Sequence, residues 1–183
     1  DAVAKRRKLG LRTARKNIYD LCDEESFIEY GGLMVAARRR TQSMEELIKT
    51  TQADGLITGL GHVNGKYFDD DQSRCLVMSY DYTVLAGTQG LNNHRKKDRM
   101  FELAKQLKLP LIIFAEGGGG RPGDTDMNIV AGLDCAAFTL YAQLSGLVPL
   151  VSICSGRCFA GNAALLGCSD VVIATRNSSI GMG

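Results

Sequence analysis

Tryptophan is absent from this chain, histidine occurs only at positions 62 and 94, and no run of eighteen apolar residues occurs. The missing apolar run argues against a membrane-spanning helix, and the charged first residues do not form a signal peptide. The net charge of only +2 argues against a general nucleic-acid surface. We therefore expect a cytoplasmic protein that binds neither membranes nor nucleic acid.

The scarcity of histidine also limits metal and triad chemistry. The two histidines lie in distant segments, and no second pair of Cys or His residues at ligand spacing accompanies Cys154 and Cys158. Neither His62 nor His94 has an adjacent nucleophile of the Ser-His-Asp kind. Three adjacent aspartates at 69–71 lack further oxygen ligands at a regular offset, which indicates a solvated loop tip. We expect no bound metal, and the six cysteines are expected to be reduced thiols.

Residues 1–53 form a basic leader, because ten of the 22 basic residues fall before Thr41. Apolar spacing predicts a helix over 2–21 with a basic face and a strand over 27–35. A polar connection follows, with a short helix over 44–49. A charged face of this kind is most often simply solvated, and the alternative is that some of its arginines approach an anionic ligand.

From residue 54 onward, short apolar strands alternate with amphipathic helices. The apolar runs at 56–63 and 75–80, with the turn signal Asn64-Gly65 between them, predict a hairpin. Further strands are predicted at 111–115, 148–153 and 171–174, and helices at 91–107, 133–144 and 160–166. The lysines and arginines of the first helix are expected to face solvent. Such alternation predicts an α/β domain with a largely parallel sheet covered by helices.

Two of these strands end in glycine-containing turns that lead into helices. The first turn has four consecutive glycines at 117–120, followed by Arg121, and the second turn covers 155–163. Glycine costs roughly 1 kcal/mol of chain entropy relative to alanine, so a run of four is expected where backbone adopts positive φ or contacts a ligand. The four-glycine turn has the pattern of neither a phosphate loop nor a dinucleotide fingerprint. Facing one cleft, the two turns would form an oxyanion hole from backbone N–H groups.

Four motifs in this order, at 54–59, 79–90, 117–121 and 156–161, resemble the N-terminal carboxyltransferase domain of acetyl-CoA and propionyl-CoA carboxylases, in the crotonase superfamily. Segments 8–15 and 27–29 are also similar to the basic helix and first strand of that family. The resemblance implies an α/β crotonase-like fold of repeated ββα units, shared with the Clp protease proteolytic subunit. It implies a carboxyltransferase domain over 54–183 that is incomplete at its C-terminal end.

The resemblance also implies the chemistry. An acyl-CoA would lose its α-proton to biotin, and the thioester enolate would attack carbon dioxide released from carboxybiotin, so the protein would supply N–H donors and no base. We predict these donors to be the amides of Gly119, Gly120, Ala160 and Gly161. Arg121 is expected to order the loop, the alternative being contact with a CoA phosphate. Gly118, Arg121 and Phe159 are predicted to line the substrate site.

The implied partners are the C-terminal carboxyltransferase domain, the biotin carboxyl carrier, biotin carboxylase, and further copies of the chain in a homo-oligomer. The biotin side of the site is implied to belong to the C-terminal domain, so we expect this chain alone to be inactive. Arg157 and Phe159 replace small or rigid residues of the family pattern, which leaves the acyl chain length open. Two alternatives stay open: a biotin-dependent decarboxylase subunit of the glutaconyl-CoA type, and a non-catalytic crotonase-fold assembly module with Phe159 filling the pocket.

Overall fold

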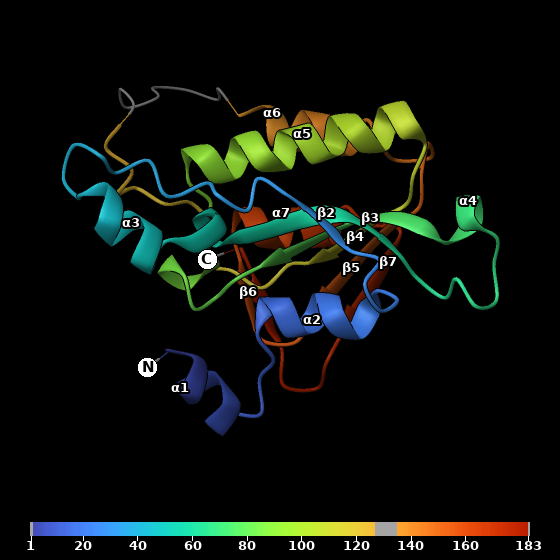
Figure 1. The fold of residues 1–183 in the computed structure, drawn as a ribbon, viewed down its shortest axis with the longest axis horizontal. Coiled ribbons are helices and arrows are strands. Elements are labelled where there is room, and N and C mark those ends of the chain that lie inside the picture. The colour runs from blue at the N-terminus through green and yellow to red at the C-terminus, as the bar shows by residue number, and fades with distance from the viewer. Residues whose placement is uncertain (1, 127–134, 183) are drawn as a thin grey trace.

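A twisted six-stranded sheet forms the centre of the computed structural model, which describes residues 2–126 and 135–182 (Figure 1). The sheet has the order β1-β2-β3-β4-β5-β7. The strands are β1 (Ile28–Tyr30), β2 (Leu56–His62), β3 (Arg74–Tyr80), β4 (Leu111–Phe114), β5 (Leu150–Cys154) and β7 (Val171–Ala174). The first three strands are antiparallel neighbours, whereas β3, β4, β5 and β7 run parallel. The predicted mixture of one hairpin and a parallel sheet is therefore confirmed.

The hairpin of β2 and β3 aligns Leu56 with Tyr80 and His62 with Arg74. At its tip the acidic insert forms the one-turn helix α4 (Asp70–Ser73), which projects from the body of the fold (Figure 1). The aspartates at 69–71 are exposed to solvent, as predicted for a loop tip. Across residues 2–126 and 135–182, no group of three His, Cys, Asp or Glu side chains could hold a metal ion.

Helices cover both faces of the sheet (Figure 1). On one face lie α5 (Leu91–Leu107) and α6 (Ala136–Ala142), with α2 (Ala14–Leu21) on the other. Successive residues of β3 therefore enter different cores, because side chains alternate along a strand. Leu76 and Met78 join the cluster under α5 and α6, whereas Cys75 and Val77 join the cluster under α2.

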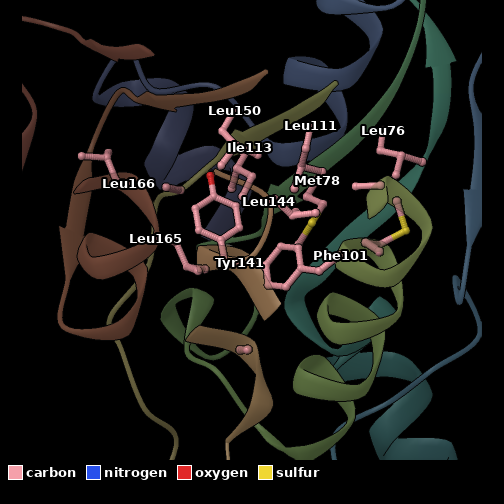
Figure 2. Packing of buried hydrophobic residues seen from close by; sticks show 14 of the residues in the cluster. Leu76, Met78, Phe101, Leu111, Ile113, Tyr141, Leu144, Leu150, Leu165 and Leu166 are labelled. Carbon is pink, nitrogen blue, oxygen red and sulfur yellow. The ribbon is translucent and has the colours of Figure 1, made fainter. Parts of the chain in front are cut away.

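The larger core places an aromatic pair between the helices and the parallel strands (Figure 2). The ring centroids of Phe101 and Tyr141 lie 5.0 Å apart at an interplanar angle of 49°, a tilted arrangement that aromatic pairs favour. Leucine, isoleucine and methionine side chains from the neighbouring strands pack against them (Figure 2). This core anchors the strands whose ends carry the two glycine turns.

The leader departs from its predicted structure. Instead of one helix over 2–21 it forms α1 (Ala2–Lys8) and α2, with Gly10 between them in the left-handed region at φ +70°. The predicted strand over 27–35 shortens to the three residues of β1, which pair with β2. The predicted short helix is confirmed as α3 (Met44–Thr50), begun by a capping box of Ser43 and Glu46.

Two lysines of α5 contradict the prediction that its basic residues face solvent. Lys96 is 5% exposed and Lys97 is fully buried. Lys96 donates hydrogen bonds to the carbonyl oxygens of Ala53, at 2.9 Å, and Leu56. Lys97 donates to Oε1 of Gln89 at 2.7 Å. A buried ammonium is tolerated when it has polar partners, which helical spacing alone does not reveal.

The C-terminal third adds a second, two-stranded sheet that the sequence did not predict. Its parallel strands are β6 (Arg157–Phe159) and β8 (Ser179–Gly181). Helix α7 (Gly161–Gly167) follows β6 directly and agrees with the predicted helix over 160–166. Of the predicted helix over 133–144, residues 133–134 lie outside the described residues. None of the helices in the described part of the chain is long and apolar enough to cross a membrane.

Candidate active site

The two glycine turns lie directly against each other. The N–H of Gly117 donates to the carbonyl oxygen of Arg157 at 2.8 Å, and the N–H of Phe159 donates to the carbonyl oxygen of Gly117 at 2.9 Å. A side chain on Gly119 would place its Cβ 2.7 Å from the Cβ of Ala160, so only glycine fits at 119. The close approach of Ala160 explains why residue 119 is a glycine. The two turns lie together, as the sequence predicted.

Gln89 fixes the direction of the peptide between Gly119 and Gly120. The N–H of Gln89 donates to the carbonyl oxygen of Gly119 at 2.7 Å, and the N–H of Arg121 donates to the carbonyl oxygen of Gln89 at 3.0 Å. In a trans peptide the N–H points opposite to the C=O, so the N–H of Gly120 points away from Gln89. A Cβ on Gly120 would meet no atom within 4 Å. Gly120 is itself exposed, so the protein leaves this residue open on its Cβ side.

Of the four predicted donors, two are already paired within the protein. The N–H of Gly119 donates to Oδ1 of Asn162 at 3.2 Å, and the N–H of Ala160 donates to the carbonyl oxygen of Gly181 at 3.0 Å. The N–H groups of Gly120 and Gly161 have no hydrogen-bond acceptor among residues 2–126 and 135–182. Of the predicted donors, one on each turn thus remains open.

Arg121, which ends the glycine run, is 9% exposed and points into the protein. Its guanidinium forms an ion pair with Asp54. It also donates to the carbonyl oxygen of Thr88 at 2.7 Å and to the Thr88 hydroxyl at 3.2 Å. These contacts order the loop, and the alternative expectation of a phosphate contact has no support in this geometry.

Asp54 completes this buried support. Its second carboxylate oxygen accepts a hydrogen bond from the N–H of Asn93 at 2.7 Å. Burial raises the pKa of Asp54 above its ordinary value, and the contact with Arg121 opposes that rise. In the sequence, Asp54 was noted only as the first residue of a motif. Nothing in the sequence indicated that its carboxylate pairs with Arg121, which lies 67 residues further along the chain.

Ala160 adopts an unfavourable backbone conformation at the start of α7. Its φ of +49° and ψ of −121° belong to a region that residues with a Cβ rarely occupy. Its N–H bond to Gly181 and its contact with Gly119 fix this conformation. Such strain costs on the order of 1–3 kcal/mol.

Replacing Ala160 by glycine should therefore stabilise the protein. The relief of strain exceeds the cost of a more flexible unfolded chain, and we expect the free energy of unfolding to rise by about 1 kcal/mol. Urea denaturation measures the change. The control is Ala164→Gly within α7, which should lower the free energy of unfolding by about 1 kcal/mol. A similar loss in both variants would contradict the strain at Ala160.

A cavity of about 600 Å³ opens where the two turns begin, lined in part by Glu116 and Gly156. Its wall includes α1, Tyr82 and Thr83. The lining residues Lys5 and Arg157 are exposed, and both carry positive charge. The cavity thus lies beside the two turns and has cations in its lining, which suits a ligand with an anionic group.

Arg6 also lines this cavity, but unlike Lys5 and Arg157 it is buried and already paired within the protein. It is 7% exposed and its Nη2 lies 2.7 Å from Oε2 of Glu116. It also donates twice to the carbonyl oxygen of Arg12, and it lies 5.7 Å from the centre of the Tyr82 ring. Arg6 therefore ties α1 to the residue that precedes the glycine run.

A larger cavity of about 1040 Å³ lies between the segment that carries α3 and the start of α5. Leu33, Met44 and Ile48 contribute apolar surface, and arginines 15, 39, 40 and 95 contribute charge. None of its lining residues belongs to either glycine turn. We therefore place the candidate site at the two turns, next to the smaller cavity, which Glu116, Gly156 and Arg157 help to line.

The carboxyl transferase domain family matches residues 5–183 of the chain. The chain belongs to this family. It is 33% identical over 176 residues to the biotin-dependent long chain acyl-coenzyme A carboxylase beta4 subunit of Mycobacterium tuberculosis, covering 96% of this chain and 30% of that protein. It is 34% identical over 167 residues to the propionyl-CoA carboxylase beta chain of Saccharopolyspora erythraea, covering 87% of this chain and 27% of that protein.

Solved structures of carboxyltransferases have the same fold. A single-chain, multi-domain long-chain acyl-CoA carboxylase is 58% identical, with a TM-score of 0.94, and the match covers 100% of this chain and 18% of that one. Transcarboxylase 12S is 26% identical, with a TM-score of 0.77, over 98% of this chain and 33% of that one. The predicted family and crotonase-like fold are confirmed. The carboxyl transferase chain spans about 30% of the length of the curated relatives it matches.

Proposed function

We propose that this chain forms the acyl-CoA side of the carboxyltransferase site in a biotin-dependent acyl-CoA carboxylase. The observation that carries the proposal is the pair of open N–H groups, Gly120 and Gly161, on two turns that contact each other. Preorganised amides of this kind stabilise an oxygen that becomes negative in the transition state. The enolate of a CoA thioester has such an oxygen.

In the proposed mechanism the chain binds, orients and polarises the thioester. Gly120 and Gly161 donate to the thioester oxygen, and removing one such donor in comparable sites costs about 2.7–4 kcal/mol. The exposed cations Lys5 and Arg157 at the cavity rim attract the CoA phosphates. The site is also shaped by Gly118, Arg121 and Phe159. Arg121 acts indirectly, because its ion pair with Asp54 holds the end of the glycine run in place. Phe159 is half-buried beside Gly181 and limits the acyl pocket.

Carboxybiotin is the proposed second substrate, and it supplies the carboxyl group and accepts the α-proton. The donor set of this chain suits the other half of that reaction, because the open N–H groups of Gly120 and Gly161 are neutral amides that neither give up nor take a proton. We propose that the C-terminal carboxyltransferase domain binds biotin, and that biotin carboxylase and the carrier deliver it. We also propose a cytoplasmic homo-oligomer, with acetyl-CoA or propionyl-CoA as substrate, in fatty acid metabolism.

The test uses the full-length protein that contains this chain, together with its biotin carboxylase and biotinylated carrier. We expect labelled bicarbonate to enter an acid-stable product only when ATP and an acyl-CoA are both present. Release of carbon dioxide from glutaconyl-CoA without such fixation would favour the decarboxylase alternative. Calorimetric titration with acetyl-CoA and propionyl-CoA that shows no binding at millimolar concentration would favour the non-catalytic module and overturn the proposal.

A further inference from the structure

A fully buried lysine lies behind the glycine turn and is used by neither the fold's apolar core nor the proposed mechanism. Lys97 projects from α5, and its ammonium donates to Oε1 of Gln89 at 2.7 Å. Burial lowers the pKa of Lys97 to about 8, and the nearby Cys135 and Asp98 oppose that fall. A buried ammonium costs several kcal/mol of desolvation, which this hydrogen bond offsets in part.

The side chain of Gln89 connects Lys97 to both glycine turns by hydrogen bonds. Its Nε2 donates to Oδ1 of Asn162 at 3.1 Å, and the same oxygen accepts the N–H of Gly119 at 3.2 Å. Gln89 and Asn162 are 5% and 0% exposed, so water does not compete with these bonds. A continuous chain of hydrogen bonds therefore runs from Lys97 through two side-chain amides to the backbone of the glycine turn.

The chain of bonds controls the two peptides that bracket Gly119. Asn162 fixes the peptide before Gly119 by accepting its N–H, and the backbone N–H of Gln89 fixes the peptide after it by binding its carbonyl oxygen. The second peptide carries the open N–H of Gly120. The orientation of Gln89 therefore sets the direction of that donor, and Lys97 holds the Gln89 side chain.

We propose that Lys97 is a positioning residue, which acts through Gln89 and Asn162 to aim the Gly120 N–H at the thioester oxygen. This inference rests on the proposed function. Lys97 lies behind the turn and touches no substrate. Its loss should therefore misdirect a donor that matters most in the transition state and should leave ground-state binding of acyl-CoA nearly unchanged.

The test compares Lys97→Met with wild type in the full-length enzyme. Methionine keeps the length of the side chain and removes the charge and the donor. We expect kcat to fall by about 10-fold with KM for the acyl-CoA within about twofold, because misaimed groups reduce rates by one to two orders of magnitude. Gln89→Leu should have a similar effect. The double variant should be little worse than either single variant, because the residues act in one chain.

Lys96→Met is the matched control, since Lys96 is also buried on α5 and its pKa is also lowered to about 8, mainly by burial. Its bonds go to the carbonyl oxygens of Ala53 and Leu56 instead of Gln89. We expect this variant to lose stability while kcat stays within about twofold of wild type. An equal fall of kcat in both lysine variants would mean a general packing effect and would overturn the inference.

Hydrogen exchange of the ligand-free protein gives a readout that does not depend on activity. In Lys97→Met we expect faster exchange at 117–121 than in wild type or Lys96→Met. If wild type transfers no carboxyl group but this difference is seen, the proposed function fails and the positioning contact stands. If wild type is active and Lys97→Met keeps both kcat and loop protection, the positioning role is wrong. Should Lys97→Met not fold, Gln89→Leu provides the same two readouts.

Discussion

Replacing Arg121 by methionine should lower the free energy of unfolding by about 3–5 kcal/mol, the range seen when one partner of a buried ion pair is removed. The side chains of Arg121 and Asp54 are 2% and 0% exposed, so water cannot solvate the remaining carboxylate. Burial already raises the pKa of Asp54, and without its arginine the carboxyl group should take up a proton on folding. The glycine turn should lose its order together with this support.

Urea unfolding of the wild type and the variant at pH 7 measures this loss. The control is Arg74→Met, which removes an exposed pair with Asp71 at 2.8 Å and should cost less than about 1 kcal/mol. Adding Asp54→Asn to Arg121→Met should recover part of the loss, because the unpaired charge is then removed. A loss below about 1 kcal/mol for Arg121→Met would show that the buried pair does not support the turn.

Replacing Gly120 by proline should reduce kcat of the full-length enzyme by about 100- to 1000-fold, the effect of removing one oxyanion donor. Proline removes the N–H that has no acceptor in the described part of the chain and leaves all other residues unchanged. The thioester enolate then loses one of its two proposed donors. Steady-state carboxylation with labelled bicarbonate measures kcat and KM separately.

Gly120→Ala is the matched control for this change. It keeps the N–H, and the added Cβ meets no protein atom within 4 Å. We expect this variant to retain kcat within about 10-fold, with any loss appearing mainly in KM for longer acyl groups. Equal inactivation by alanine and proline would indicate that bulk at position 120, and not the missing N–H, causes the loss. The Gly120 amide would then not be a donor in the reaction.

Local sequence signals predicted the elements that depend on local physics. The Asn64-Gly65 turn and its flanking apolar runs predicted the hairpin of β2 and β3. Helix α5 begins and ends where the pattern placed it, at Leu91 and Leu107. The four-glycine run also predicted backbone contact correctly, because Gly119 has φ +87° and leaves no room for a Cβ. In each case the signal lies within a few residues of the element it specifies.

Long-range partners account for what the sequence could not give. Lysine is a residue type that usually faces solvent. The burial of Lys97 depends on Gln89, Asn162 and the glycine turn, which lie far from it in the sequence or were not recognised as its partners. The pairing of the Ala160 N–H with Gly181 likewise requires β8, a strand of three residues that has no periodicity to detect. Which amides stay open is therefore a property of the assembled fold.

The bond between Arg6 and Glu116 joins residues 110 positions apart and has a practical consequence for anyone shortening this protein. Glu116 is 4% exposed and stands immediately before the glycine run. A version that starts at α2 would keep the whole central sheet and yet remove Arg6, the cation that pairs with this carboxylate. Helix α1 thus forms one wall of the 600 Å³ cavity beside the glycine turns, and a truncation that removes this helix removes that wall.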